Sequence, residues 1–129
     1  MEDLNMKYIT ALLFALFFLN PNTGLADEPV VIRDIEIAKK TAEETDTKLL
    51  LVFGAEWCKY CIFLENDLMR NIEKIEGYTV CYVDFDTQKD LVRKYGVSSI
   101  PKSVVLNGDS IKTKVGYRNF DNYKLWLGL

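Results

Sequence analysis

Residues 49 to 61 read Leu-Leu-Leu-Val-Phe-Gly-Ala-Glu-Trp-Cys-Lys-Tyr-Cys, an apolar run that stops at Gly54 and is followed by two cysteines. A continuous apolar run with Val and Phe is typical of a strand covered on both faces, as in a parallel sheet. The exit from such a strand is where functional sites form. We therefore expect a buried strand that leads into a helix whose first turn carries Cys58 and Cys61.

The residues after Cys61 predict an amphipathic helix. Apolar side chains recur at three- and four-residue spacing at Leu64, Leu68, Met69, Ile72 and Ile75, and Gly77 ends the pattern. Cys58 is then at the helix N-terminus, where unpaired N–H groups and the positive end of the helix dipole stabilise a thiolate. Lys59 adds a positive charge beside it, and Cys61, one turn later, is within reach to close a disulfide.

Two blocks of the sequence resemble the thioredoxin superfamily. The first, Trp57-Cys58-Lys59-Tyr60-Cys61, is similar to the family's Trp-Cys-x-x-Cys active site at a strand-to-helix junction. The second, Tyr-Gly-Val-Ser-Ser-Ile-Pro at 95–101 followed by Val-Val-Leu-Asn-Gly at 104–108, resembles its cis-proline stretch and hairpin. The resemblance implies an α/β, thioredoxin-like fold over nearly all of residues 30–129, with a mixed central sheet flanked by helices in the order βαβαββα. A CxxC pair alone would also fit half a zinc site or a structural bridge.

The remaining pattern predicts the other elements of that fold. The N-terminal half adds a strand at 30–32, a helix capped by Asp34 with an apolar face at Ile35, Ala38 and Ala42, and a strand at 78–85. A short helix follows, opened by a capping box at 87–90 and ended by Gly96. Strands at 103–106 and 111–115 flank the turn signal Asn107-Gly108, and a last helix begins at Asn119 or Asp121.

The resemblance also implies roles for the dithiol and its neighbours. Cys58 is the exposed attacker, and Cys61 is the recessed resolver that displaces the partner from a mixed disulfide. Two thiols one helical turn apart have a very high effective concentration, so this intermediate should be short-lived. Trp57 is expected on the surface around the site, with core packing as the alternative. Tyr60 either contacts the substrate or only shapes the loop.

Pro101 corresponds to the family's cis-proline facing the dithiol, with Ile100 as the residue whose backbone pairs with an extended substrate segment. A cis bond is common only before proline, and it leaves backbone groups open for pairing. The alternative is an ordinary trans proline in a turn. Lys102 stands where the family commonly has threonine, which leaves partner choice open.

The core strand departs from the family pattern. Many thioredoxins have a buried Asp six residues before the first cysteine, where this chain has Val52, and Tyr82 replaces the lysine that often partners that Asp. The chain therefore lacks the family's usual proton acceptor for the resolving cysteine. Water or Glu56 are alternatives, although Glu56 fits a solvated loop residue better.

Cys81 is the odd thiol of the chain. We expect it to be a small apolar residue in a strand and only secondarily a partner in an intermolecular bridge. A zinc site from Cys58, Cys61 and Cys81 is a weaker alternative, because the chain has no histidine and no second CxxC. The absence of histidine also excludes Cys-His proteases and the copper-delivery relatives of this fold that need a His ligand. We expect neither a metal nor a bound cofactor.

The N-terminal 26 residues predict a signal peptide. Lys7 precedes a stretch of twelve uncharged residues at 8–19, too short to span a bilayer comfortably, and Gly24-Leu25-Ala26 supplies small residues for a signal peptidase. The expected domains are a signal peptide at 1–26 and a thioredoxin-like domain at 27–129, located in the periplasm or secreted. An uncleaved membrane anchor is the alternative, and the true start is either Met1 or Met6.

Length, composition and charge limit the class of protein. A chain of 129 residues with 49% hydrophobic and 27% charged residues is ordinary for one globular domain. A net charge of −3 without a basic stripe argues against a nucleic-acid partner. We expect a monomeric, exported thiol-disulfide oxidoreductase whose partners are protein thiols or disulfides, including a membrane or soluble redox partner. The alternative is a non-catalytic binding module with a structural or regulatory disulfide. The direction of electron flow stays open, because subtle thiolate stabilisation sets it.

Overall fold

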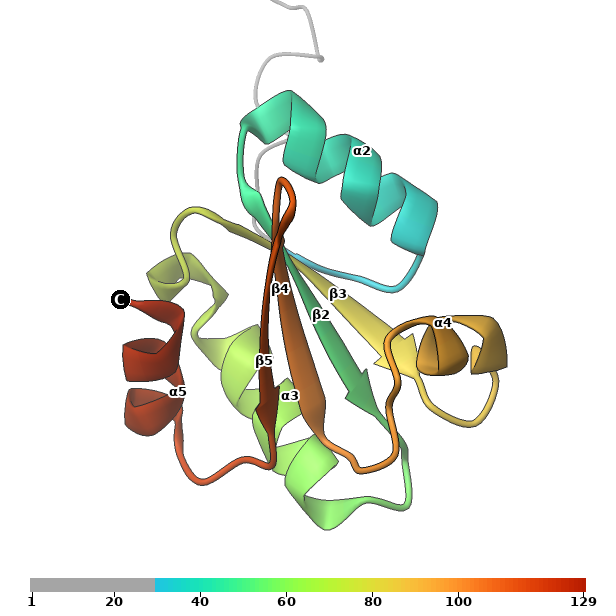
Figure 1. The fold of residues 1–129 in the computed structure, drawn as a ribbon. Coiled ribbons are helices and arrows are strands. Elements are labelled where there is room, and N and C mark those ends of the chain that lie inside the picture. The colour runs from blue at the N-terminus through green and yellow to red at the C-terminus, as the bar shows by residue number, and fades with distance from the viewer. Residues whose placement is uncertain (1–29) are drawn as a thin grey trace, which may run out of the picture.

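The computed structural model describes residues 30–129, so the expected signal peptide, its cleavage site and the alternative membrane anchor lie outside the described residues. The elements, in chain order, are β1 (Val31–Ile32), α2 (Ile35–Thr45), β2 (Lys48–Gly54), α3 (Lys59–Arg70), a 3-10 helix (Ile72–Lys74), β3 (Tyr78–Asp84), α4 (Lys89–Lys94), β4 (Lys102–Asn107), β5 (Ser110–Val115) and α5 (Phe120–Leu127) (Figure 1). None of these helices is long and apolar enough to cross a membrane.

The five strands form one mixed sheet in the order β1-β3-β2-β4-β5. Strand β3 pairs in parallel with both β1 and β2, and β4 runs antiparallel to both β2 and β5. The central strand β2 is buried along its length after Lys48, as its continuous apolar run predicts. The thioredoxin-like α/β fold expected from the sequence is therefore confirmed. Its element order is βαβαβαββα, so the expected order βαβαββα is wrong by one strand–helix pair.

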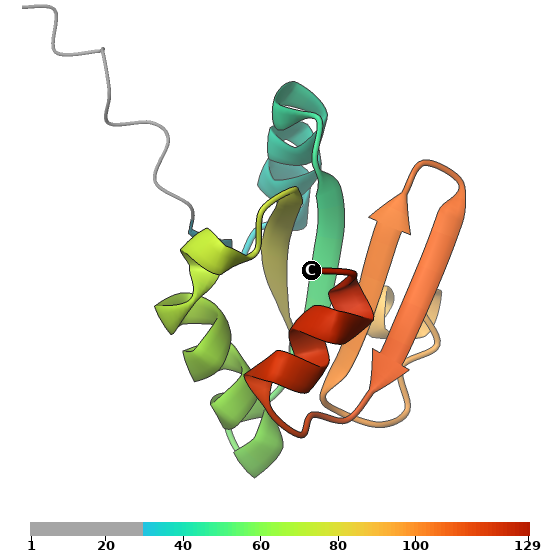
Figure 2. The ribbon, with the colours of Figure 1, turned by 90° about the vertical axis from the view of Figure 1, so that its left-hand side faces the viewer.

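Two apolar layers hold helices against opposite faces of the sheet. Alternate residues of β2 point to opposite sides, so Leu51 and Phe53 pack with α2 and α4, whereas Leu50 and Val52 pack with α3 and α5. Figures 1 and 2 show the sheet between these two helical layers. The carboxyl end of β2 passes directly into α3, which places the N-terminus of α3 at that edge of the sheet (Figure 1).

Helix α2 begins where the sequence predicts. The Asp34 carboxylate accepts hydrogen bonds from the backbone N–H groups of Glu36 and Ile37, at 2.9 and 3.1 Å. These contacts satisfy two of the donors that a helix N-terminus leaves unpaired. Ala38 and Ala42 are buried against the sheet, as their spacing predicts.

Helix α3 ends earlier than the apolar pattern predicts. The α-helix stops at Arg70, and the Asn71 side-chain amide donates to the carbonyl oxygen of Asp67 at 2.8 Å. The tighter 3-10 turn that follows still brings Ile75 into the core. Met69, expected on the apolar face, lies within α3 but is 56% exposed. It follows the buried Leu68 by one residue and therefore points about 100° away from it around the helix.

Two predicted turns have different chemistry in the structure. The capping box at 87–90 is absent, because the Gln88 side chain accepts from the Asp84 N–H at 2.8 Å instead of capping α4. The Asp84 carboxylate shapes this turn by accepting from the N–H groups of Asp86 and Thr87. The β4–β5 hairpin is present, but Asn107 pairs with Ser110, so its two loop residues are 108 and 109.

Candidate active site

Cys58 and Cys61 form a disulfide at the N-terminus of α3, with their Cα atoms 5.2 Å apart. Cys58 is the N-cap residue of the helix, and its Sγ accepts the N–H of Cys61 at 3.3 Å. Cys58 is half-buried, whereas Cys61 is almost completely buried. An external partner can therefore reach the sulfur of Cys58, whereas the sulfur of Cys61 is accessible only to Cys58.

The loop before β4 faces this disulfide. The Ile100–Pro101 peptide bond is cis, as the resemblance implies, so the alternative of an ordinary trans proline is wrong. The carbonyl oxygen of Ile100 lies 3.9 Å from Cys58 Sγ. Pro101 is buried, and its own carbonyl accepts the N–H of Gly116 at 2.8 Å. The backbone of Ile100 thus stands beside the accessible sulfur.

Two exposed aromatic residues, Trp57 and Tyr60, lie within two positions of Cys58 in the chain. Trp57 is 68% exposed, so the core-packing alternative is wrong, and its indole N–H donates to Asp86 at 2.8 Å. Tyr60 is also exposed, with its ring edge-on to Phe63 at 6.0 Å between centroids. Asp86 and Phe63 were missed by the sequence reasoning. The spacing of Tyr60 and Phe63 on one helix face was the available signal for the second of them.

Lys59 lies beside the dithiol on the first turn of α3, with its Nζ 5.6 Å from the centre of the Phe63 ring. Its ammonium therefore makes a cation–π contact in the disulfide form. Its role in stabilising the Cys58 thiolate stays a prediction.

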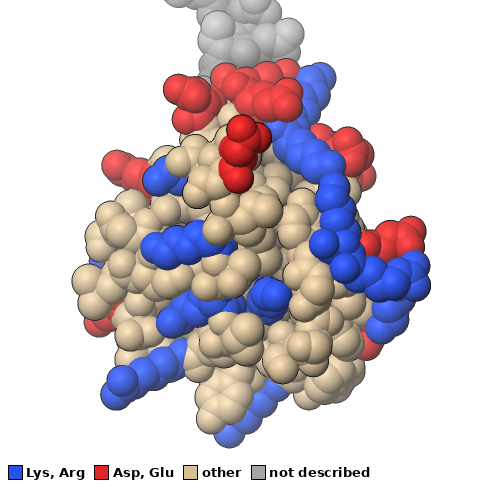
Figure 3. Space-filling view, viewed as in Figure 1, with Lys and Arg blue, Asp and Glu red and all other residues tan. Residues whose placement is uncertain are grey.

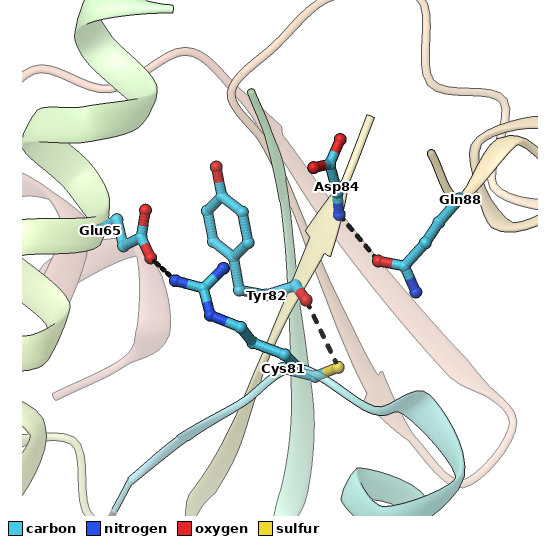
Figure 4. A network of polar contacts seen from close by, with 6 residues as sticks. Glu65, Cys81, Tyr82, Asp84 and Gln88 are labelled. Atoms are coloured by element: carbon cyan, nitrogen blue, oxygen red, sulfur yellow. Dashed lines mark hydrogen bonds and ion pairs between the residues drawn. The ribbon is translucent and has the colours of Figure 1, made fainter. Parts of the chain in front are cut away.

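Val52 and Tyr82 lie where many thioredoxins have a buried Asp and its partner Lys, and Tyr82 lies beneath the dithiol. Val52 and Tyr82 are neighbours in the parallel pairing of β2 with β3, and both are buried. The Arg33 guanidinium lies 4.8 Å from the centre of the Tyr82 ring and forms an ion pair with Glu65 of α3. Burial and then Glu65 raise the pKa of Tyr82 to about 12, against the opposing effect of Arg33. Figure 4 shows Glu65 on α3 beside the ring of Tyr82 on β3.

Glu56, the other candidate proton acceptor, is exposed in the loop between β2 and α3. This position agrees with the solvated loop residue that the sequence favours. Lys102, which stands where the family commonly has threonine, makes hydrogen bonds within the chain. Its Nζ donates to the carbonyl oxygens of Tyr95 and Gly96, at 3.2 and 3.3 Å.

Cys81 is buried on the opposite face of the sheet from Cys61, within the apolar layer under α2. Desolvation, followed by the negative charge of Asp34, raises the pKa of its thiol to about 11. Within residues 30–129, no three Cys, Asp or Glu side chains are grouped closely enough to hold a metal ion. The three cysteines are therefore not brought together, which removes the zinc alternative.

The surface near the dithiol is sparsely charged on the face drawn in Figure 3. The end of the molecule where β2 passes into α3 is mostly uncharged there, with single Lys or Arg side chains at its margins. Acidic side chains gather mainly toward the end where α2 lies. A partner that approaches this end of the molecule from the drawn side meets few charged side chains.

A model of the thioredoxin-like domain matches residues 35–128 of the chain. Mitochondrial thioredoxin of Mus musculus is 32% identical over 85 residues, covering 64% of this chain and 51% of its own. The chain thus spans about half the length of that relative. Thioredoxin of Rickettsia felis is 29% identical over 91 residues, covering 69% of this chain and 87% of its own.

Solved structures agree on the fold. The crystal structure of chloroplastic thioredoxin z superposes with a TM-score of 0.63 at 20% identity, covering 79% of this chain and 96% of that one. The germline-specific thioredoxin Deadhead of Drosophila melanogaster gives a TM-score of 0.63 at 22% identity, covering 78% of this chain and 98% of its own. At such identities the likeness concerns the fold alone.

Proposed function

Because the chain belongs to the thioredoxin-like family, we propose that it is a thiol-disulfide oxidoreductase that exchanges disulfides with protein partners in an extracytoplasmic compartment. The observation that carries the proposal is the asymmetry of the pair. Cys58 is half-buried at the N-terminus of α3 beside the Ile100 carbonyl, whereas Cys61 is buried behind it. A structural bridge would need neither the accessible sulfur nor the open backbone beside it.

In the reductive direction, the Cys58 thiolate attacks a partner disulfide. One partner sulfur leaves as a thiolate, and the other stays bonded to Cys58 in a mixed disulfide. Cys61 then attacks Cys58 Sγ, which forms the internal disulfide and releases the second partner sulfur. The oxidative direction is the reverse of these steps. In this proposal, the backbone of Ile100, whose carbonyl oxygen lies 3.9 Å from Cys58 Sγ, pairs with an extended partner segment during both steps.

The compartment is supported by the sequence alone. The short apolar stretch at 8–19 and the Gly24-Leu25-Ala26 site support a signal peptide at 1–26 and a mature domain at 27–129. In an oxidising compartment the protein needs a membrane or soluble redox partner that supplies electrons or oxidant.

Trapping of mixed disulfides tests the function. The full chain and its variants are expressed in an exporting host, acid-quenched, and compared on reducing and non-reducing gels. Cys61→Ser should accumulate covalent partners through Cys58, because the nucleophile remains but cannot be displaced from within. Cys58→Ser should trap little, and Cys81→Ala should leave trapping unchanged because that thiol is buried elsewhere. The intact mass of the exported protein should correspond to a chain that begins at Asp27.

One observation favours the alternative, a non-catalytic binding module. The buried Val52 stands where the family usually has the proton acceptor for the resolving cysteine. If neither single variant captures a partner, or both capture equally, the disulfide is structural or regulatory and the proposed function is wrong. A protein that retains its N-terminus and stays with the membrane would overturn the proposed export.

A further inference from the structure

The hydroxyl of Tyr82 and the Cβ atom of Cys61 converge on one point above Gly54. A Cβ atom built on Gly54 would lie 2.6 Å from the Tyr82 hydroxyl oxygen and 3.0 Å from Cys61 Cβ. The first distance is shorter than real Cβ contacts and the second is at the tight limit, so a side chain at position 54 would force the phenol to shift. The last residue of β2 thereby admits a phenol oxygen directly beneath the resolving cysteine.

We propose that the Tyr82 hydroxyl donates a hydrogen bond to the Cys61 thiolate and so stabilises it during the resolving step. This inference rests on the proposed function, because it concerns the same dithiol. Val52 has no polar group to interact with Cys61, and the hydroxyl of its neighbour Tyr82 supplies one. Tyr82 stabilises the resolving thiolate and does not take up its proton.

Tyr82 is suited to donate because it stays protonated. Its buried ring and the nearby Glu65 raise the pKa of the phenol to about 12. Of the charged groups around the phenol, Arg33 lowers that pKa, whereas Glu65 of α3, Asp84 of β3 and Glu56 of the β2–α3 loop raise it. At neutral pH the hydroxyl therefore keeps its hydrogen, and the proton of Cys61 leaves to water.

The ring is held in place from outside the dithiol. Arg33 lies over one face of the ring at 4.8 Å from its centre, and its ion pair with Glu65 ties that cation to α3. None of the residues drawn in Figure 4 forms a hydrogen bond with the hydroxyl. These residues therefore leave the phenol free to donate when reduction separates the Cys61 sulfur from Cys58.

The step balances without another reactant. The Cys61 thiolate attacks Cys58 Sγ of a mixed disulfide, the Cys58–Cys61 sulfur bond forms, and the bond from Cys58 to the partner sulfur breaks. The partner sulfur leaves as a thiolate with the electron pair. The dithiol has then lost two electrons to the original partner disulfide, and Tyr82 has kept its proton.

The reaction of the reduced protein with the chromogenic disulfide dithiobis(nitrobenzoate) separates the two steps. Attack by Cys58 releases one coloured thiolate, and attack by Cys61 on the mixed disulfide releases the second. The rate of the second release, measured from pH 6 to pH 10 by stopped flow, reports the thiolate fraction of Cys61. No protein partner is needed.

We expect Tyr82→Phe to slow the second release about three- to tenfold at neutral pH. Loss of a hydrogen bond to the thiolate, which contributes about 1.4 kcal/mol or more, lowers the thiolate fraction about tenfold, and the greater nucleophilicity of the more basic thiolate recovers part of the rate. The pH profile of this release should move upward by about one unit. At high pH the variant should equal or exceed the native rate, because the thiolate is then formed without help and a more basic thiolate is the better nucleophile. A packing defect would lower the rate at every pH. The first release should not change.

Tyr78→Phe is the matched control. It removes a phenol from the same strand, where the hydroxyl donates to the Leu127 carbonyl at 2.5 Å, away from the dithiol. Both releases should match those of the native protein. Thermal unfolding of each variant checks that the comparison is between folded proteins.

Gly54→Ala tests the position of the Tyr82 hydroxyl without removing it, because the added Cβ would displace that hydroxyl. It should slow the second release in the native background and have a smaller effect in the Tyr82→Phe background. An unchanged pH profile in Tyr82→Phe, with a normal second release, overturns this inference and leaves the proposed function standing. Absence of any second release from the native protein overturns the proposed function itself.

Discussion

Cys58 and Cys81 are thiols in opposite environments. Cys58 caps the N-terminus of α3, where the helix dipole and the backbone N–H of Cys61 favour an anion. Cys81 lies in the apolar layer under α2, where burial and the charge of Asp34 raise its pKa to about 11. The environment of each sulfur, and not its residue type, sets its reactivity.

In the reduced protein, we expect alkylation of Cys58 by iodoacetamide to reach half of its maximal rate below about pH 8.5, the value of a free thiol. Cys81 should stay unlabelled at that pH, because its thiol is buried and protonated there. Peptide mass spectrometry after labelling from pH 5 to pH 10 distinguishes the sites.

The same labelling in concentrated urea is the control. All three cysteines should then react alike, with a midpoint near pH 8.5. A Cys58 that titrates at or above this value in the folded protein would contradict its activation by the helix N-terminus.

At the scale of elements, the short helix α4 is hydrogen-bonded to the first residue of β4, the strand that directly follows the cis-proline. Lys102, the first residue of β4, donates to the carbonyl oxygens of Tyr95 and Gly96 at the C-terminal end of α4. A cation there also interacts favourably with the negative end of the helix dipole. Lysine at this position, where the family commonly has threonine, therefore has a structural explanation within the chain.

We expect Lys102→Met to lower the free energy of unfolding by about 1 kcal/mol, because two backbone carbonyls lose their charged donor while the apolar stem of the side chain is kept. Equilibrium unfolding in urea measures the change. Lys74→Met, at an exposed position of the 3-10 helix, should shift it by less than about 0.5 kcal/mol. Equal effects of the two substitutions would show that the Lys102 contacts contribute nothing.

At the scale of the whole molecule, the sheet is stabilised by apolar layers on both faces. Leu64 of α3 is completely buried against the sheet, in the layer that also contains Tyr82. Leu125 of α5 is 74% exposed. The two leucines therefore offer the same substitution in opposite surroundings.

Leu64→Ala should reduce the free energy of unfolding by about 2 to 5 kcal/mol, through lost burial and the cavity left behind. Leu125→Ala should change it by less than about 0.5 kcal/mol. Urea unfolding followed by tryptophan fluorescence gives both values. A small effect of Leu64→Ala would mean that α3 is not held by this layer, and the position of the dithiol would need another explanation.

Local sequence determined most of the elements and the reactive pair. The apolar run of β2, the Asp34 cap, the CxxC spacing and the turn signal at Asn107 each act within a few residues, so their periodicity and side-chain chemistry are readable without a fold. The cis-proline was implied by the family resemblance together with its surrounding motif. The early end of α3 was misjudged because apolar spacing continued beyond Arg70 into a 3-10 turn.

Tertiary structure alone decided how distant residues meet. The approach of Tyr82 to Cys61 depends on the pairing of β2 with β3 and on the space left by Gly54. The contact of Trp57 with Asp86 likewise joins two loops that are far apart in the chain. Such contacts follow from strand order and register, which no short segment specifies, and they determine which sulfur is exposed and which groups surround it.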